Sequence, residues 1–536
     1  MTPQKRLTLI ACILGSGIVF LDGTVVNVAL PAIQRDLNAS LAAQQWVAEA
    51  FLLTLSSFLL VGGSLDDIFE RRTVFNLGLA GFGLFSLVCA VAPNVELLIA
   101  ARALQGVAGA LLVPSTLAII TNTFAESERG PAIGTWTAWA GISTVVGPLG
   151  GGLLIDSFSW RFIFLINVPL VLLTVALSMK AIPRMEPPER GMRVDYLGAL
   201  LCVLGLGGTV FALIEQQRLG FGDPLVAGTG IGGVVSLVLF VLHESRTDHP
   251  MMPLYLFRSR NFAVGNFTTF AMYAGLGGAL FFVGLYLQQV AGYSAVEAGA
   301  AFLPITVMMF FLSKRWGALS DRIGPRLFMG GGPIIAAVGM ALMMRIGRDA
   351  GYLSEVLPGL LVFGLGLSMT VAPLTATVLA SVDQKHSGVA SGVNNAISRI
   401  AGLIAIAALG AVVAAQFTSE VDHKLPAVPR GSAESAVVAE ARTRALSVEP
   451  ADRLTGAARV RVRNVLADAS TSGFRLGLGI GAGLVFLGGV AALVGIENPR
   501  RKVAAEECPG GPICGAPQDV ARDLPVAVPA GEPARA

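Results

Sequence analysis

The sequence predicts an all-α integral membrane protein of about fourteen transmembrane helices. Hydrophobic residues make up 54% of its 536 residues and charged residues only 14%, whereas a soluble domain carries about 25% charged residues. The mean hydropathy is +0.70. Apolar stretches of roughly 18–25 residues recur along the chain, each long enough to cross a hydrocarbon core about 30 Å thick. They are rich in Gly and Ala and show little period-two alternation, which favours a helical bundle over a β-barrel.

The helices are expected wherever an apolar stretch of spanning length lies between charged flanks. The first stretch follows Lys5 and Arg6 and could pass for a signal peptide. It lacks a small-x-small cleavage site and carries Asp22 and Asn27, so we expect it to remain as the first helix. The expected spans are 8–31, 46–65, 73–92, 97–121, 133–155, 162–182, 196–215, 225–243, 262–289, 296–316, 327–345, 355–379, 390–416 and 474–496.

Basic residues predict the orientation. If the N-terminus is inside, Lys and Arg concentrate in the inner segments, and the short outer loops hold only five arginines. This asymmetry predicts that both termini are cytoplasmic. The abundance of Arg, Ala and Gly favours a GC-rich bacterial source, and therefore the bacterial inner membrane.

A repeated motif divides the helices into two related groups. Both copies read Gly-x-Leu-x-Asp and reach an Arg nine positions after the Gly, and they begin at Gly63 and Gly317. The second copy follows the tenth helix rather than the eighth, so the seventh and eighth helices are interpreted as an insertion between two six-helix halves. The expected domains are 1–182 for the N-terminal half, 183–261 for the inserted pair and its linkers, 262–499 for the C-terminal half and 500–536 for a disordered cytoplasmic tail.

One connection is unusually long. Residues from about 417 to 473 are polar and charged, and they fall on the outer side. Val437–Leu446 and Arg453–Asp468 are candidates for short surface helices, and the simpler interpretation is a solvated loop without a function of its own.

Further signatures follow one another in order along the chain. They are Leu21–Pro31 in the first helix, Arg102–Gly106 in the fourth, Gly147–Gly151 in the fifth and Trp160–Pro169 at the start of the sixth. With the repeated motif and the topology, they make the chain resemble the major facilitator superfamily over roughly residues 8–500. Within it, the chain is similar to the fourteen-helix drug:proton antiporter branch of multidrug efflux permeases.

The resemblance implies the major facilitator fold and a secondary transporter that works by alternating access. It would export hydrophobic or cationic drugs or antibiotics across the inner membrane, driven by the proton gradient and without a cofactor. Two alternatives stay open. One keeps the fold but exports an endogenous metabolite, siderophore, lipid or amino acid. The other is a membrane scaffold or enzyme.

The resemblance also gives the repeated motif a role. Its acids, Asp67 and Asp321, would be latches that face a neighbouring helix end, where the dipole is positive. The accompanying motif residues are Gly63, Arg72, Gly317, Arg322 and Arg326. The alternative is a charged, positive-inside turn. In the first copy Ile68 and Glu70 depart from the family pattern, so a latch is more strongly indicated at Asp321.

The fifth helix is rich in glycine around a proline. Pro148 removes a backbone donor, and the neighbouring Gly147 and Gly151 remove side-chain bulk, so the helix can bend and pack closely. The resemblance implies a contact between the halves that seals against proton leak. Simple close packing of helices is the alternative.

Ionisable side chains within the spans are the sharpest candidates for coupling, because such groups are costly in a bilayer and usually face a cavity or a partner. Asp22 lies well inside the first helix, and a carboxylate in a low-dielectric cavity can load and release protons near physiological pH. Arg102 is its candidate partner, and Glu49 and Asn27 are further coupling or cavity residues. The alternatives are a structural hydrogen bond at Asp22, a structural ion pair at Arg102 and an interfacial charge at Glu49. Glu215, in the inserted pair, is a weaker candidate.

No motif of an enzyme is recognised. The chain has no Gly-x-x-x-x-Gly-Lys loop for phosphates and no His-Glu-x-x-His pattern, and its five cysteines are scattered, so no catalytic residue and no metal site are predicted. The expected partners are a small lipophilic or cationic compound and the lipid bilayer, with no nucleic acid. A monomer is expected, with a periplasmic adaptor as an open possibility.

Overall fold

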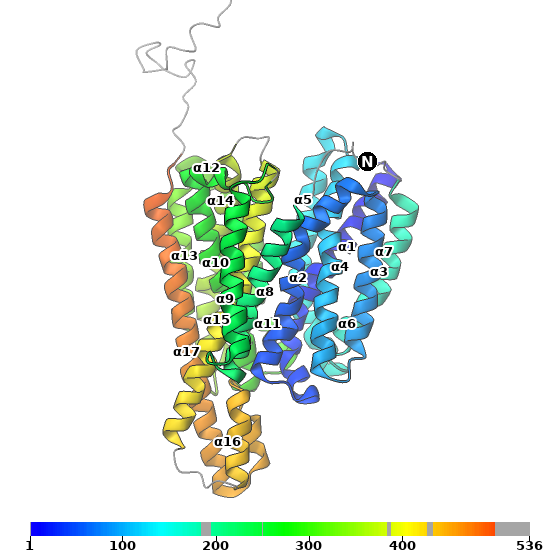
Figure 1. Ribbon diagram of the computed structural model, residues 1–536. Coiled ribbons are helices and arrows are strands. Elements are labelled where there is room, and N and C mark those ends of the chain that lie inside the picture. The colour runs from blue at the N-terminus through cyan, green and yellow to red at the C-terminus, as the bar shows by residue number, and fades with distance from the viewer. Residues whose placement is uncertain (1, 184–194, 249, 383–386, 426–431, 499–536) are drawn as a thin grey trace, which may run out of the picture. The chain divides into compact units, whose positions relative to one another are not determined.

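In the computed structural model, long helices run side by side through the bundle (Figure 1). The structure describes residues 2–183, 195–248, 250–382, 387–425 and 432–498, except for some side chains, mostly in the second and fifth helices. Within these ranges, twelve helical segments are long and apolar enough to cross a membrane. Helices α2 and α5 have 28 and 32 residues, which also exceeds the spanning length. The expected disordered tail, 500–536, lies outside the described residues.

The N-terminal half holds six spans, of which the last is interrupted. Its helices are α1 (Pro3–Leu37), α2 (Leu41–Ile68), α3 (Arg71–Ala90), α4 (Val95–Thr123), α5 (Glu126–Ser157), α6 (Phe162–Leu165) and α7 (Asn167–Ala181). Side chains fix several starts: Thr2 accepts a hydrogen bond from the N–H of Lys5, and Asn94 accepts one from the N–H of Leu97.

The inserted pair is α8 (Tyr196–Leu219) and α9 (Pro224–Glu244). Asp195 and Asp223 cap these two helices through their side chains. Helix α8 packs against α9 and also against α2 and α15, which belong to opposite halves. The inserted pair therefore touches the seam between the halves.

The C-terminal half also holds six spans and carries an added helical region. Its elements are η1 (Leu254–Arg258), α10 (Arg260–Gln289), α11 (Ala295–Ala301), α12 (Leu303–Ile323), α13 (Arg326–Met343), η2 (Tyr352–Val356), α14 (Leu357–Ala380), α15 (Ser387–Lys424), α16 (Ala433–Thr443), η4 (Glu449–Arg453) and α17 (Gly456–Gly495). Helices α11 and α12 together form one span, and so do η2 and α14.

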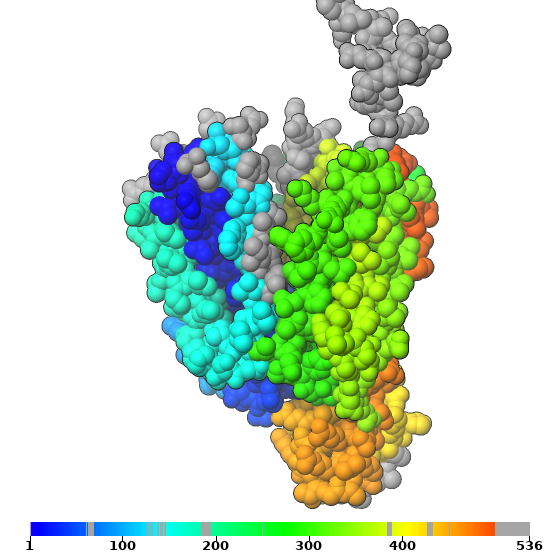
Figure 2. Space-filling view, turned by 180° about the vertical axis from the view of Figure 1, so that it is seen from behind, coloured from blue at the N-terminus to red at the C-terminus, as the bar shows by residue number. Residues whose placement is uncertain are grey.

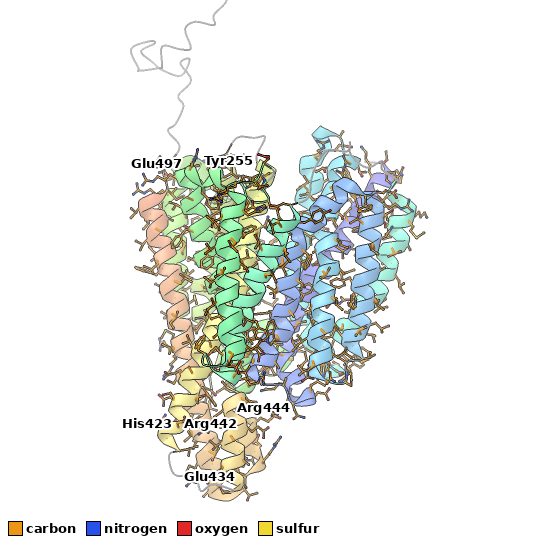
Figure 3. The ribbon with its side chains drawn as sticks, in the orientation of Figure 1. Tyr255, His423, Glu434, Arg442, Arg444 and Glu497 are labelled. Carbon is orange, nitrogen blue, oxygen red and sulfur yellow. The ribbon has the colours of Figure 1, made fainter. Side chains whose placement is uncertain are left out.

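The interpretation of residues 417–473 as a solvated loop is wrong, whereas the two helix candidates, Val437–Leu446 and Arg453–Asp468, are confirmed in part by α16 and the first turns of α17. Helix α15 continues to Lys424 and α17 already begins at Gly456, and α16 and η4 lie between them. We call α16, η4 and the adjoining ends of α15 and α17 the cap. It is the orange region at the lower end of the space-filling view (Figure 2), and Figure 3 places Glu434 and Arg444 in it, opposite Tyr255.

The cap has an apolar interior despite its polar composition. Its buried side chains belong to the same hydrophobic cluster as the C-terminal half and include Val421, Val437, Val438, Leu446, Val462 and Leu466. Its charges pair with one another at the surface, as Arg442 does with Asp422 and Arg461 with Glu434. Averaged hydropathy records the charges and misses the buried face, which is why the sequence suggested a loop.

The two halves are joined at the cap end. Among the described residues, every hydrogen bond between the halves lies there. Gln45 Nε2 donates to Ile406 O at 2.7 Å, and Asp156 accepts from the N–H of Val296 at 2.9 Å. The ribbons diverge toward the opposite end, which carries the N-terminus (Figure 1). The structure is therefore closed on the cap side.

Candidate functional site

A central cavity of about 170 Å³ lies between the two halves. Helices α1 and α5 of one half and α10, α11, α12 and α14 of the other contribute to its wall. The lining residues are Thr24, Asn27, Val28, Pro148, Leu276, Leu280, Gly284, Gln288, Ala298, Gly299, Phe302, Leu303, Ile305, Thr306, Met309 and Leu367. Most are apolar, four carry neutral polar side chains, and none of these lining residues is charged. Such a wall suits a lipophilic ligand with a few hydrogen-bonding groups.

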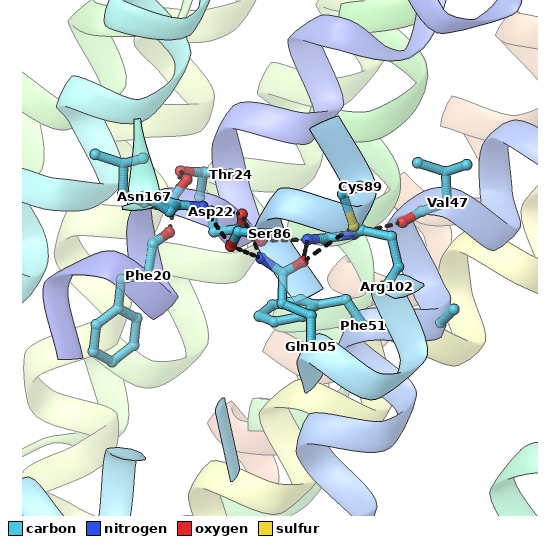
Figure 4. A network of polar contacts seen from close by, with 12 residues as sticks. Phe20, Asp22, Thr24, Val47, Phe51, Ser86, Cys89, Arg102, Gln105 and Asn167 are labelled. Atoms are coloured by element: carbon cyan, nitrogen blue, oxygen red, sulfur yellow. Dashed lines mark hydrogen bonds and ion pairs between the residues drawn. The ribbon is translucent and has the colours of Figure 1, made fainter. Parts of the chain in front are cut away.

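Asp22 and Arg102 form a buried ion pair between α1 and α4 (Figure 4). Their side chains are 0% and 1% exposed. The second carboxylate oxygen of Asp22 accepts hydrogen bonds from Gln105 Nε2 at 3.1 Å and Asn167 Nδ2 at 2.9 Å. Neither Asp22 nor Arg102 belongs to the wall of the central cavity, although Thr24, two residues after Asp22, does.

The Arg102 guanidinium is buried and has several partners besides Asp22. Its Nε donates to the carbonyl of Val47 at 3.1 Å, and its Nη1 donates to Gln105 Oε1 at 2.7 Å as well as to Asp22. The rings of Phe51 and Phe164 lie 4.3 and 5.7 Å from the guanidinium carbon, within the range of cation–π contacts. A buried pair with this many partners is held in one geometry.

Three further residues complete this network and were not predicted as site residues: Ser86, Gln105 and Asn167. Gln105 also donates to Ser86 Oγ at 2.8 Å, and Asn167 Nδ2 lies 3.3 Å from the same hydroxyl. Both Gln105 and Asn167 lie within signatures already noted, so their positions were visible while their contacts were not. Ser86 lies in an apolar run of α3, and nothing in the sequence distinguishes it from a packing residue.

Glu49 is the second fully buried acid of the N-terminal half. It is 0% exposed on α2, so the alternative of an interfacial charge does not fit. Among the described residues, neither of its carboxylate oxygens has a hydrogen-bond partner. Buried polar groups are normally hydrogen-bonded, so this unpaired carboxyl group keeps Glu49 among the predicted coupling residues.

The surroundings of Glu49 belong to both halves. One turn before it, Gln45 bonds the carbonyl of Ile406 in α15 and accepts from Gln217 Nε2 of α8 at 2.6 Å. Trp46 donates to Glu215 Oε1 at 2.9 Å, so the acid of the inserted pair is fixed to α2. This stretch of α2 therefore lies against groups that must separate when the cap side opens.

The two copies of the repeated motif are described to different extents. In the first copy, the side chain of Asp67 and the surroundings of Gly63 lie outside what the structure describes. Arg72 donates to the carbonyls of Met179 at 2.9 Å and Ile182 at 3.2 Å, and so closes the end of α7.

In the second copy, Asp321 is exposed, and no described residue bonds it. Its neighbour Arg322 is exposed too, and Arg326 donates to the carbonyl of Leu493 in α17. A Cβ added at Gly317 would lie 3.6 Å from Ala372 Cβ, which is an ordinary van der Waals contact, so a small side chain would fit at this position. The structure thus leaves the Asp321 latch without a partner in this closed-cap conformation.

The glycine-rich part of α5 contacts both halves. A Cβ at Gly147 would lie 2.5 Å from Thr24 Oγ1, and one at Gly151 would lie 2.1 Å from Val25 Cγ2, so α5 and α1 need glycine to approach this closely. On its other side, the carbonyl of Pro148 lies 2.5 Å from where a Cβ of Gly299 would be. This contact with α11 fits both the sealing role and simple close packing.

Comparison with known proteins identifies the family. A model described as the Major Facilitator Superfamily matches residues 12–406. The chain belongs to the major facilitator superfamily. It is a multi-pass membrane protein and a secondary transporter, not an enzyme.

Two relatives of this major facilitator protein match most of its length. It is 38% identical over 417 residues to the puromycin resistance protein pur8 of Streptomyces alboniger, covering 76% of this chain and 82% of that protein. It is 32% identical over 511 residues to the tetracenomycin C resistance and export protein of Streptomyces glaucescens, covering 94% of each. A solved bacterial homologue of the human lysosomal transporter Spinster shares the fold, with a TM-score of 0.64 and 17% identity over 93% of this chain and 100% of that one.

Proposed function

We propose that this protein exports lipophilic drugs or antibiotics across the bacterial inner membrane in exchange for protons, by alternating access. The central cavity carries the proposal, because it lies between the halves and its wall is largely apolar. The names of the two relatives, which describe resistance and export, support the direction of transport.

The wall also makes the expected cargo more specific. None of the described residues that line the cavity is charged, and Asp22 is held by Arg102 outside this lining. A permanent cation would enter without a counter-charge, which is unfavourable in a low-dielectric site. We therefore propose that neutral or weakly basic lipophilic compounds are exported in preference to permanent cations.

Proton coupling is assigned to the buried acids. Asp22, with Arg102 as its partner, and Glu49 are the candidates, and Asn27 is a polar residue of the cavity wall on the same helix as Asp22. Opening and closing of the halves would expose one acid at a time to water. The protein would act as a monomer with both termini in the cytoplasm.

Reconstituted protein tests the proposal. Proteoliposomes with an imposed pH gradient should move puromycin uphill together with a counter-flow of protons, and ethidium, a permanent cation, more slowly. Both fluxes are measured on the same preparation, with gradient-free liposomes as the control. Puromycin movement without proton flux would contradict antiport, and faster ethidium transport would contradict the proposed selectivity.

Cysteine labelling tests the orientation. Ala439 is exposed on the cap, and Tyr255 is exposed at the opposite end (Figure 3). An impermeant maleimide should label Ala439→Cys from outside the cytoplasmic membrane and Tyr255→Cys only after permeabilisation. The reverse pattern would overturn the assignment of the cap to the outer side.

A further inference from the structure

A second cavity lies at the cap end. It has a volume of about 610 Å³ and a polar wall, and we call it the vestibule. The end of α1, the end of α5, the α10–α11 connection and the cap all contribute to it. The lining residues are Pro31, Gln34, Arg35, Asp156, Gln288, Gln289, Val290, Gly292, Tyr293, Ser294, Ala295, Glu297, Ser447, Val448, Glu449, Asp452 and Arg463.

The vestibule adjoins the central cavity. Gln288 belongs to the walls of both. The two cavities therefore meet at this side chain of α10.

A cluster of three glutamine amides joins α10 to α1 and α2, beginning at Gln289, the residue after Gln288. Gln289 Nε2 of α10 donates to Gln34 Oε1 of α1 at 2.8 Å and lies 3.2 Å from Gln44 Oε1 of α2. Gln34 is 1% exposed and Gln44 is 0% exposed. Because α10 belongs to one half and α1 and α2 to the other, these hydrogen bonds must break when the halves part on the cap side.

The cluster leaves polar atoms unpaired. In the described structure, Gln34 Nε2, Gln44 Nε2 and Gln289 Oε1 are buried and have no hydrogen-bond partner. A buried donor or acceptor without a partner is unfavourable, so a ligand group that completes its hydrogen bonds is favoured. Gln34 and Gln289 line the vestibule, and Gln44 is absent from its lining.

Several charges around the vestibule already have partners. Asp156 accepts from the backbone N–H groups of Ala295 and Val296, at 3.3 and 2.9 Å. Asp452 accepts from Arg463 at 3.3 Å. The buried groups left to meet a ligand are therefore amides, which pair equally well with hydroxyl and carbonyl groups and do not require a charge.

We propose that the vestibule is an exit-side binding site for the exported compound, and that Gln34 and Gln289 bind its uncharged hydroxyl and carbonyl groups. This proposal rests on the proposed export function and adds a second binding site to the export path. The compound leaves the largely apolar central cavity, exchanges with the amide cluster as the halves part and pauses beneath the cap. The cap is then part of the transport path.

Protection from chemical modification tests the site directly. Glu449 lines the vestibule and is half-buried, and Ala439 is exposed on α16, away from it. Each is changed to cysteine in a background whose five native cysteines are replaced by alanine. Tetracenomycin C, which is rich in hydroxyl and carbonyl groups, should slow maleimide reaction at Glu449→Cys at least threefold. It should leave Ala439→Cys unaffected.

Protection is an equilibrium measurement and does not require turnover. Equal reaction rates at Glu449→Cys with and without tetracenomycin C would overturn the vestibule site, even if export proceeds normally. Loss of export in proteoliposomes, with protection intact, would instead count against the proposed function. Slowing at Ala439→Cys as well would point to a general change in the cap and would also overturn the site.

Two glutamine variants test whether the amides bind the exported compound or only hold the two halves together. Gln34→Leu removes an amide of both the cluster and the vestibule, whereas Gln44→Leu removes one of the cluster alone. The loss of one hydrogen bond corresponds to about fivefold weaker binding. The tetracenomycin C concentration that gives half-maximal protection of Glu449→Cys should therefore rise about fivefold in Gln34→Leu. It should be unchanged in Gln44→Leu. Equal effects of both variants would show that the amides only seal the halves.

Discussion

Two buried acids of the N-terminal half, Asp22 and Glu49, have opposite environments. Asp22 accepts hydrogen bonds from Arg102, Gln105 and Asn167, whereas no described residue bonds either oxygen of Glu49. Both side chains are 0% exposed. The difference shows that burial alone does not define a coupling residue. Asp22 is held by a fixed cation and two amides, whereas Glu49 has no described partner that would hold it.

The comparison suggests a division of roles. The Arg102 network ties Asp22 to the arrangement of α1 and α4. Glu49 lies on a stretch of α2 that contacts α8 and α15, so its surroundings would change if the halves part there. Substitutions at Arg102, Asp22 and Glu49 test this division of roles, and substitutions at Asp321 and Asp67 test the latch.

Arg102→Ala should have the largest effect. It leaves the Asp22 carboxylate buried without its cation, and breaking a buried pair in this way costs about 3–5 kcal/mol. Thermal unfolding in detergent should shift to markedly lower temperature, and puromycin export should be lost. Arg102→Lys should recover only part of both, because lysine lacks the planar fork of the guanidinium. Wild-type stability in Arg102→Ala would show that Asp22 does not depend on this partner.

Asp22→Asn should abolish export driven by a pH gradient. The amide mimics the protonated acid and keeps most of the shape of the network, so exchange of puromycin without a gradient should survive. Gradient-driven efflux and proton uptake are measured together in proteoliposomes. Normal proton-coupled efflux would make Glu49 the leading coupling acid.

Glu49→Gln should leave stability unchanged and reduce coupling. No described hydrogen bond is lost, because neither oxygen of Glu49 has a described partner. If Glu49 exchanges protons when the seam opens, proton uptake per exported puromycin should fall. Unfolding temperature and proton stoichiometry are compared with the wild-type protein. A lower unfolding temperature at unchanged stoichiometry would assign Glu49 a structural role instead.

Asp321→Asn should have the smallest effect. Asparagine keeps the shape of the side chain and removes only a charge–dipole interaction of about 0.3–1 kcal/mol. Export should slow by up to about fivefold at normal protein levels, since the latch would act only when the N-terminal side closes. The exposed Asp248 serves as a matched control, and Asp67→Asn should do less than Asp321→Asn. Wild-type turnover in all three variants would remove the latch hypothesis.

Much of the fold could be predicted from the sequence. Apolar stretches of spanning length predicted the helices, and the spacing of the two motif copies predicted two six-helix halves with an inserted pair. The predicted boundaries failed mainly at the cap, where α15 and α17 run far beyond the expected spans. There the buried face is narrow and Arg side chains surround it, so average polarity outweighed the helical pattern.

The candidate site was predicted less completely. An acid and an arginine in apolar helices identified Asp22 and Arg102 as partners, because few other groups can compensate a charge at that depth. Ser86 and the amides of the cap-side cluster were not identified. Their chemistry is common in ordinary helix packing, so only their positions in space distinguish them.

The residues alone indicate that this chain spans a membrane many times, that one motif recurs in both halves and that charged groups lie within the apolar spans of the first half. These properties follow from the local balance between apolar length and isolated charge. Three features appear only in the folded structure: Asp22 is paired whereas Glu49 has no described partner, the inserted α8 contacts both halves, and the cap lines a polar vestibule. The physical reason is that hydropathy records how each segment partitions between lipid and water, whereas hydrogen-bond partners and cavities depend on which helix faces meet, and those faces come from segments far apart in the chain.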